Sequence, residues 1–167
     1  MTHALHTRLA TLDDVAALTP LLISYQAFYD HTPDADGARA FLQDALGTGQ
    51  DIIFMTLRGD EVLGYLQISP GFHPAQLRRT YAINNLYVTS QARGLGVGSL
   101  LMRAARDYAQ AHNATKLTLM ALPELWTSQA FYESHGWRHN DKLQVFEWPI
   151  AGAPSVDAAD PACATAA

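Results

Sequence analysis

A glycine-rich turn between a predicted strand and a predicted helix constrains this chain more than any other feature. Residues 94–98 read Gly-Leu-Gly-Val-Gly, between a largely apolar stretch at residues 82–88 and an amphipathic pattern at residues 98–112. Glycine lets the backbone adopt positive φ values and approach a ligand closely. The first N–H groups of a helix lack intrahelical partners and attract anions. The pattern therefore predicts a cradle for the pyrophosphate of a nucleotide-bearing cofactor.

The spacing of these glycines excludes two common nucleotide-binding loops. A dinucleotide loop needs Gly-x-Gly-x-x-Gly and an acidic residue about 20 positions further on, and this segment has neither. It also lacks the Gly-Lys-Ser/Thr ending of a nucleoside triphosphate loop. A flexible turn without a ligand remains the alternative at this point.

Size and composition narrow the class of protein. The 167 residues, 49% of them hydrophobic, suit one domain with a sizeable core. A net charge of -5 argues against nucleic acid as a partner, because phosphate binding needs clustered Lys and Arg. No apolar run approaches the roughly 18 residues of a membrane span, and the single cysteine, Cys163, favours a reducing compartment. We therefore expect a cytoplasmic protein with neither a membrane nor a nucleic acid as partner.

Hydrophobic spacing along the chain predicts an α/β fold. The predicted strands cover residues 8–10, 52–57, 62–68, 80–88, 116–120 and 145–148, and the predicted helices cover residues 12–29, 40–46, 98–112 and 128–134. Pro20 is expected to kink or divide the first helix, and residues 32–38 and 70–74 read as turn and loop. This order predicts a mixed, mostly antiparallel sheet flanked by helices, in one domain at residues 7–150. Residues 151–167 lack periodicity and are expected to form a disordered Ala/Pro-rich tail.

Two motifs resemble those of the GCN5-related N-acetyltransferase (GNAT) superfamily. Residues 91–96 read Gln-Ala-Arg-Gly-Leu-Gly and fit the Q/R-x-x-G-x-G/A pattern that follows the family's fourth strand and opens its third helix. Residues 128–137 resemble the family's later helix, which ends in Tyr-x-x-x-Gly-aromatic. The resemblance covers roughly residues 7–150. It implies the GNAT-like acyl-CoA N-acyltransferase fold, acetyl-CoA as cosubstrate and N-acetyltransferase activity.

The resemblance also implies which residues hold acetyl-CoA. In this superfamily the fourth strand splays from the fifth and leaves backbone groups for the pantetheine arm and the thioester carbonyl. The N–H groups of residues 93–99 would then take the pyrophosphate, while Ser128 stands where many relatives have Ala. The implied set comprises Leu86, Tyr87, Val88, Gln91, Arg93, Gly94, Leu95, Gly96, Val97, Gly98, Ser99, Ser128 and Phe131.

Tyr132 matches the family's general acid, which protonates the departing thiolate. A thiol pKa of about 8.5 means that the leaving group needs only modest help, so loss of this hydroxyl should slow turnover without abolishing it. The alternative is a tyrosine that packs in the core or positions the cofactor sulfur.

The general base is not apparent from the sequence. An alkyl ammonium with a pKa near 10.4 must lose a proton before it attacks a thioester. Relatives often carry Glu or Asp near the end of the fourth strand, where this chain has Asn84 and Asn85. Asn85 could still orient a water, and Tyr81 or His73 could contribute. The missing carboxylate keeps a second reading open, a non-catalytic acyl-CoA-binding regulatory domain of the same fold.

The amine substrate is expected near the first helix. Tyr25, Phe28 and Tyr29 recur there at helical spacing, close to several aspartates, and suit a cation if they face a pocket. Core packing is the alternative for these rings. With Asn85 they form the predicted substrate-binding set for a small primary amine, such as a polyamine or a lysine side chain, which attacks directly in a ternary complex.

Two further expectations concern metals and subunits. The seven histidines are scattered without a supporting Cys or Asp cluster, so no metal site is predicted. Many relatives pair through their last strands, and Phe146 and Trp148 are candidates for the interface of a homodimer. A place in the monomer core is the alternative for both rings.

Overall fold

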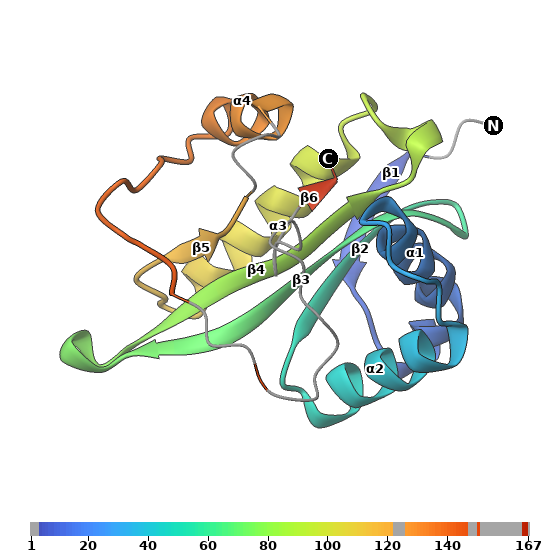
Figure 1. Ribbon diagram of the computed structural model, residues 1–167, viewed down its shortest axis with the longest axis horizontal. Helices are drawn as coiled ribbons and strands as arrows, with labels where there is room; N and C mark the ends of the chain where they lie inside the picture. Colours follow the sequence, from blue (N-terminus) through green and yellow to red (C-terminus); the bar gives the residue numbers. More distant parts are fainter. Residues whose placement is uncertain (1–3, 122–125, 147–149, 151–164, 167) are drawn as a thin grey trace.

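A single sheet carries helices on both of its faces in the computed structural model (Figure 1), which describes residues 4–121, 126–146, 150 and 165–166. The strand order is β1-β2-β3-β4-β5, with β6 beside β4. The strands are β1 (Leu5–Leu9), β2 (Ile52–Arg58), β3 (Glu61–His73), β4 (Arg78–Val88), β5 (Leu117–Leu119) and β6 (Thr165–Ala166). Neighbours from β1 to β4 are antiparallel, whereas β5 and β6 run parallel to β4. The predicted mixed, mostly antiparallel sheet is confirmed.

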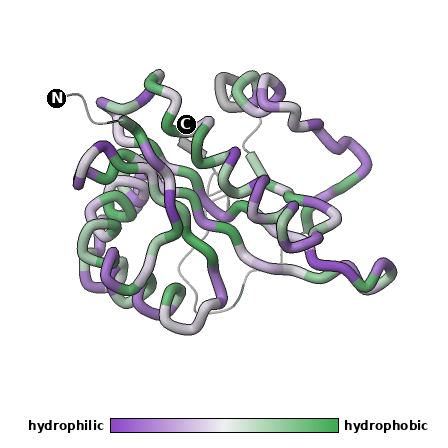
Figure 2. The backbone as a smooth tube through the Cα atoms, turned by 180° about the vertical axis from the view of Figure 1, so that it is seen from behind, coloured by the Kyte–Doolittle hydropathy of each residue, from purple (hydrophilic) through white to green (hydrophobic). Residues whose placement is uncertain are grey.

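The helices bury two separate apolar clusters against the sheet. Helices α1 (Val15–Phe28) and α2 (Ala35–Thr48) cover one face, and α3 (Val97–Ala111) covers the other, with α4 (Trp126–Ser134) beside α3 (Figure 1). Because side chains alternate along a strand, consecutive residues of β4 enter different clusters: Leu86 packs under α3 and Tyr87 under α1. Hydrophilic residues (purple) and hydrophobic residues (green) alternate along the helices in Figure 2, as expected for helices with one buried side.

Two helix predictions need correction at their boundaries. α1 continues through Pro20, which lies on its exposed side and does not divide it. α2 begins at Ala35, inside the predicted turn, because the Asp34 carboxylate caps it by accepting the Gly37 N–H at 2.9 Å. The helix ends at Gly49, whose φ of 66° is the left-handed conformation typical of helix ends.

The predicted loop at residues 70–74 is mostly strand. β3 continues to His73 and pairs with β4 as far as Arg78, so the two strands form a long ribbon that projects from the sheet (Figure 1). Sequence reasoning interpreted the Pro and Gly residues here as loop signals. Pairing with β4 overrides that local preference, because the partner strand supplies hydrogen bonds along the whole segment.

The middle of β4 contains an irregularity and a parting of strands. β5 pairs with β4 only at residues 81–83, so β4 lacks this neighbour from residue 84 onward. Across the sheet, Gln67 pairs with Asn85 and Ile68 pairs with Ile83, which leaves Asn84 as the extra residue of a β-bulge. Bulges locally re-aim side chains, and this one lies where β4 parts from β5, next to the residues that pair with β6.

The predicted closing strand is not formed in its described part. Val145 and Phe146 have no strand partner, and Phe146 is 88% exposed. Glu147 and Trp148 lie outside the described residues, and the homodimer interface remains a prediction. None of the helices in the described ranges is long and apolar enough to cross a bilayer. The same ranges bring together no group of three or more potential metal-binding side chains.

Candidate acetyl-transfer site

The second half of β4 offers backbone groups to an extended ligand. The Thr89 N–H donates to the Leu63 carbonyl at 2.9 Å. Backbone groups alternate in direction along an antiparallel strand, so the N–H groups of Leu86 and Val88 point away from β3, toward the open edge. Those of Tyr87 point toward β3. Strand β6 lies along the same edge, with its two residues opposite Leu86 and Tyr87.

The turn between β4 and α3 presents a row of backbone donors. Gly94 and Gly96 adopt φ values of 76° and 84°, which side chains rarely tolerate. The N–H groups of Arg93 and Leu95 are used inside the turn, where they donate to Ser90 and Ala92 at 3.4 and 3.3 Å. Within the described residues, the N–H groups left without a partner here belong to Gly94, Gly96, Val97, Gly98 and Ser99. Of the seven N–H groups predicted to take the pyrophosphate, those of residues 93–99, five are therefore free to bind a ligand.

Two polar side chains of the predicted set flank this turn. The Arg93 guanidinium folds back, with Nε donating to the Val88 carbonyl at 3.3 Å and Cζ lying 5.5 Å from the centre of the Phe28 ring. It therefore ties the turn to α1. Gln91 is exposed, and its Oε1 accepts a hydrogen bond from the Ser90 hydroxyl at 3.2 Å.

Tyr132 lies on α4 and faces the sheet. Its side chain is 5% exposed and belongs to the same apolar cluster as Leu86 and Val88. Phe131, the neighbouring member of the predicted set, packs over α3 with a ring atom 3.3 Å from where a Cβ on Gly98 would lie. Ser128 is in α4, but its side chain lies outside the described part of the structure. The structure thus places the Tyr132 ring in the apolar cluster on the α3 side of the sheet.

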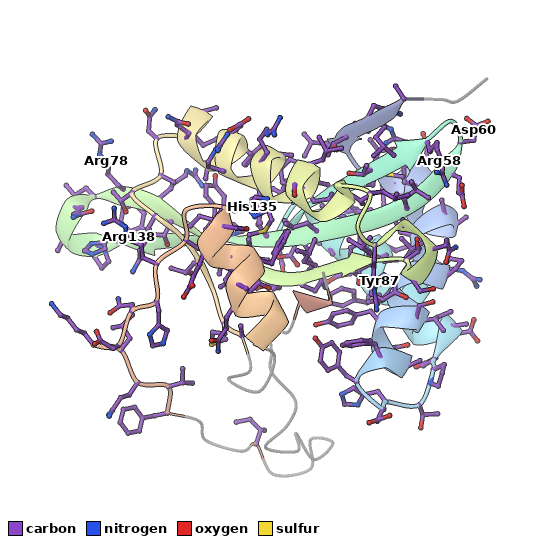
Figure 3. The ribbon with its side chains drawn as sticks, turned by 90° about the horizontal axis from the view of Figure 1, so that it is seen from above. Arg58, Asp60, Arg78, Tyr87, His135 and Arg138 are labelled. Atoms are coloured by element: carbon purple, nitrogen blue, oxygen red, sulfur yellow. The ribbon has the colours of Figure 1, made fainter. Side chains whose placement is uncertain are left out.

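A cavity of about 480 Å³ separates α3 from the end of α4. His135 spans it at one end, with Nε2 2.8 Å from the Ser99 hydroxyl, and Arg138 follows on the next segment (Figure 3). Its lining residues are Ser99, Met102, Arg103, Arg106, Leu117, Ser134, His135, Gly136, Trp137 and Arg138. Three arginines around one cavity make it suitable for an anion. Sequence reasoning missed these arginines, because nothing in their spacing reveals that they share a cavity.

An aromatic group lies on the opposite, α1 side of β4. Tyr25 packs edge-on against Tyr29 and Tyr87, with ring centres 5.0 and 6.4 Å apart, and Phe28 lies 5.0 Å from Tyr29. Phe28 is 43% exposed and the other two α1 rings are half-buried, so these rings are not a closed core. Beneath them Tyr65 is fully buried, and burial, followed by the nearby Tyr25 and Tyr87, raises the pKa of its hydroxyl well above 10.

The bulge side chains also lie on the α1 side. Asn85 is 7% exposed, and its Nδ2 donates to Gln67 Oε1 at 3.0 Å. The two other groups considered as a base lie elsewhere. Tyr81 packs edge-on against Tyr108 on the α3 face, where burial raises its pKa, and His73 is at the tip of the β3–β4 ribbon.

Comparison with known proteins decides the family. The model of the acetyltransferase (GNAT) family matches residues 18–137, well over half of the chain. The chain belongs to the GNAT family. An uncharacterised N-acetyltransferase of Bacillus subtilis, YhfO, is 33% identical over 136 residues, which are 81% of this chain and 91% of that protein. Family and relatives make this chain an N-acetyltransferase, and the GNAT family implies acetyl-CoA as its acetyl donor.

Solved structures agree with the GNAT fold. The crystal structure of a probable acetyltransferase superposes with a TM-score of 0.84 at 27% identity, covering 89% of this chain and 99% of that one. An aminoglycoside acetyltransferase from a soil metagenome, meta-AAC0020, matches with a TM-score of 0.75 at 17% identity, over 87% of this chain and 96% of that one. This second likeness concerns the fold alone.

Proposed function

We propose that this GNAT protein transfers the acetyl group of acetyl-CoA to the amino group of a small primary amine, by direct attack in a ternary complex. The observation that carries the proposal is the contiguity of two binding features. The edge of β4 beyond β5, along which β6 pairs with Leu86 and Tyr87, leads directly into the five free N–H groups of the β4–α3 turn. An extended chain that ends in a pyrophosphate fits such a strip.

The residues present fit each part of acetyl-CoA. The N–H groups of Leu86 and Val88 suit the amides of the pantetheine arm, and the turn with the N-terminus of α3 suits the pyrophosphate. The three arginines that line the cavity between α3 and α4, Arg103, Arg106 and Arg138, suit the phosphate group of acetyl-CoA that is not part of the pyrophosphate. Neither Arg103 nor Arg138 has a carboxylate partner within the described residues, so both charges are available to an anion. Binding of β6 and binding of the arm at this edge exclude one another, since both need the same backbone groups.

Acetyl-CoA supplies an acetyl group activated as a thioester. The chain contributes a backbone N–H at the open edge that can stabilise negative charge on the carbonyl oxygen. Tyr132, on the α3 side of this edge, is the proposed proton donor to the departing thiolate. Cys163 is in the C-terminal region outside the described residues, and direct transfer needs no nucleophile from the protein.

A primary amine suits the α1 side of the site. Tyr25, Phe28 and Tyr29 lie beside the end of β4, and aromatic faces attract ammonium groups. The metagenomic relative by fold acts, according to its name, on aminoglycosides, which are polyamines. We therefore place polyamines and aminoglycosides first among the substrates, followed by lysine side chains.

The test is thiol release from acetyl-CoA with a panel of spermidine, lysine, a peptide N-terminus and an aminoglycoside. Turnover on one amine, with its acetylated product identified by mass spectrometry, would support the proposal and name the substrate. If acetyl-CoA binds but no amine in the panel is acetylated, small primary amines are not the substrates and the proposal fails.

A further inference from the structure

The β-bulge in β4 places two consecutive asparagines on the same face of the sheet. Residues of a regular strand alternate between faces, but Asn84 is the extra residue of the bulge and Asn85 follows it. Both side chains reach across to β3, Asn85 to Gln67 and Asn84 to Ser69. Gln67 and Ser69 are two residues apart on β3 and so share one face, the face of α1 and α2. Both amides therefore lie on the side of β4 opposite to Tyr132.

A single carboxylate, that of Asp51, accepts hydrogen bonds from both Gln67 and Ser69. Asp51, which precedes β2, accepts a hydrogen bond from Gln67 Nε2 at 2.9 Å through Oδ2 and another from the Ser69 hydroxyl through Oδ1. Two branches thus start from Asp51, one through Gln67 to Asn85 and one through Ser69 to Asn84. The sequence places Asp51 more than 30 residues before these asparagines, so neither branch is visible in it.

The chemistry of a carboxylate fixes the direction of every bond in both branches. An ionised carboxylate only accepts hydrogen bonds. Gln67 must therefore present its Nε2 to Asp51, which turns its Oε1 toward Asn85. Asn85 must therefore donate to Gln67 Oε1 through its Nδ2, and the Asn85 Oδ1 is then directed away from the branch. In the other branch the Ser69 proton goes to Asp51, so the Ser69 oxygen accepts from Asn84 Nδ2 and Asn84 Oδ1 is likewise left over.

One of these two oxygens, Asn85 Oδ1, has no explanation within the described part of the chain. Asn85 Oδ1 is fully buried and has no hydrogen-bond partner among the described residues. A buried oxygen without a partner is costly, and such groups are rare in folded proteins. Its position on β4, one residue before the open edge begins to present the Leu86 backbone, points to a ligand bound at that edge.

We propose that Asp51 is a positioning residue that orients Asn84 and Asn85, and that their two Oδ1 atoms bind the two N–H groups of the attacking primary amine. A neutral primary amine has two N–H donors and one lone pair, so two carbonyl oxygens can hold the donors and leave the lone pair for the thioester. Neither amide carries a proton away, and the arrangement thus acts in recognition and orientation. The inference deepens the proposed function and rests on it.

The first test compares a primary amine with its N-methyl derivative. Butylamine has two N–H groups and N-methylbutylamine has one, so the wild-type enzyme should prefer butylamine in kcat/KM by about 10-fold or more, the usual effect of one unmatched buried polar group. D51N removes the carboxylate that fixes the bond directions, because an asparagine at position 51 both donates and accepts. We expect the preference to fall to within about twofold, while the KM for acetyl-CoA stays unchanged.

The matched control is D44N, which removes the same charge from an exposed position on α2. It should leave the amine preference intact. A preference that survives in D51N would overturn the inference, even where overall activity is lower, because a merely structural role would slow both amines alike. If the wild type acetylates neither amine, the proposed function fails for alkyl amines, and a binding measurement then decides the inference.

That measurement is the side-chain amide NMR spectrum of the uniformly labelled protein, titrated with butylamine. The NH₂ resonances of Asn84 and Asn85 should shift in the wild type and in D44N, and should not shift in D51N or N85L. Shifts confined to surface amides, or shifts of equal size in D51N, would contradict the assignment of the two oxygens.

Discussion

The two sides of the proposed site are built from different parts of the chain. On the cofactor side, the open edge of β4 and the turn before α3 present backbone N–H groups, and only the fold is needed to align them. On the amine side, toward α1 and α2, the surface consists of side chains: three aromatic rings and two asparagines held by Asp51. Backbone donors tolerate substitution of side chains, whereas a network of side chains depends on every member.

The largest expected effect is on the cofactor side. G96V puts a β-branched residue at a φ of 84°, so the turn must change its conformation. Loss of two hydrogen bonds to the pyrophosphate, at about 1.5 kcal/mol each, predicts a KM for acetyl-CoA about 100-fold higher. Isothermal titration with acetyl-CoA checks this independently of the amine.

G49V is the matched control for strain. Gly49 has a φ of 66° at the end of α2, far from the turn, so this variant should lose comparable stability and bind acetyl-CoA normally. Equal loss of acetyl-CoA affinity in both variants would refute a cradle at Gly96.

Y132F tests Tyr132 as the proposed proton donor to the departing thiolate. We expect kcat to fall by about 100-fold, at the lower end for general acid–base catalysis, because a thiolate leaves with little help. The KM for both substrates should change little, as the ring still packs in the α3 cluster. Y108F, which changes a ring of the same cluster on α3, should keep its activity. Unchanged kcat in Y132F would leave Tyr132 with a packing role only.

Y25L sharpens the contrast by acting on the amine side alone. Leucine keeps apolar packing against Tyr87 but removes the aromatic face. A cation–π contact of about 1 kcal/mol predicts a roughly fivefold higher KM for the amine, with the KM for acetyl-CoA unchanged. F41L, on an exposed ring of α2, is the control. A change in acetyl-CoA affinity instead would mean that the two sides are not independent.

Truncation after Ile150 tests whether the chain competes with its own cofactor. β6 pairs with Leu86 and Tyr87 at the edge where the pantetheine arm is proposed to bind. Removing a competing conformation raises the apparent affinity by the reciprocal of the fraction of molecules that were competent to bind. We therefore expect acetyl-CoA to bind about two- to fivefold more tightly. Weaker binding by the truncated protein would instead give this segment a role in holding the cofactor.

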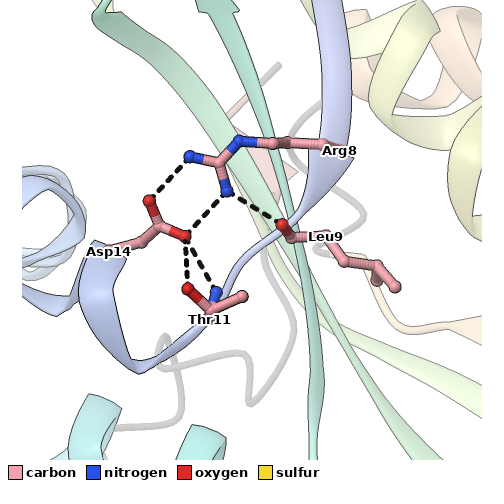
Figure 4. Close-up of polar contacts among 4 residues, drawn as sticks. All are labelled: Arg8, Leu9, Thr11 and Asp14. Carbon is pink, nitrogen blue, oxygen red and sulfur yellow. Dashed lines mark hydrogen bonds and ion pairs between the residues drawn. The ribbon is translucent and has the colours of Figure 1, made fainter.

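The smallest effect is expected far from both sides. Arg8 donates two hydrogen bonds of 2.7 Å to Asp14, whose carboxylate also accepts the Thr11 N–H at 2.8 Å (Figure 4). The bonds from Arg8 are the main cause that lowers the pKa of Asp14 from 3.8 to about 2. The folded state therefore holds this proton less tightly than the unfolded state, and the pair stabilises the fold above pH 3.8 and ceases to do so as the pH falls to about 2.

D14N should consequently lower the free energy of unfolding at pH 7 by no more than about 1 kcal/mol, since the Arg8 side chain is 41% exposed and water screens the pair. The difference from the wild type should shrink as the pH falls through about 2, because the Asp14 carboxyl then becomes protonated in the folded state as well as in the unfolded state. Urea unfolding at several pH values measures it, with D13N as the control and with kinetics at pH 7 unchanged. A difference that does not shrink over this pH range would assign the effect to something other than charge.

The contrast between the two sides also explains what the sequence could predict. The glycine turn and the helix after it are local patterns of adjacent residues, so a cradle could be predicted there. The order of elements up to α4 could be inferred in the same way and the fold is confirmed, whereas the predicted closing strand is not formed in its described part. Asp51, Gln67, Ser69 and the asparagines come from separate strands, and their meeting depends on sheet register and on a bulge. Arg103 and Arg138 similarly share a cavity only because α4 packs beside α3. Local spacing carries no information about such long-range contacts.

A crystal structure with coenzyme A and butylamine tests the central claim most directly, that the second half of β4 joins a backbone-built cofactor side to a side-chain-built amine side. We expect the pantetheine arm along Leu86 and Val88 in place of β6, and the amine nitrogen between Asn84 and Asn85. The pyrophosphate should lie on the free N–H groups of Gly94, Gly96, Val97, Gly98 and Ser99. Coenzyme A bound away from this edge, or an amine bound on the α3 side with Tyr132, would contradict it.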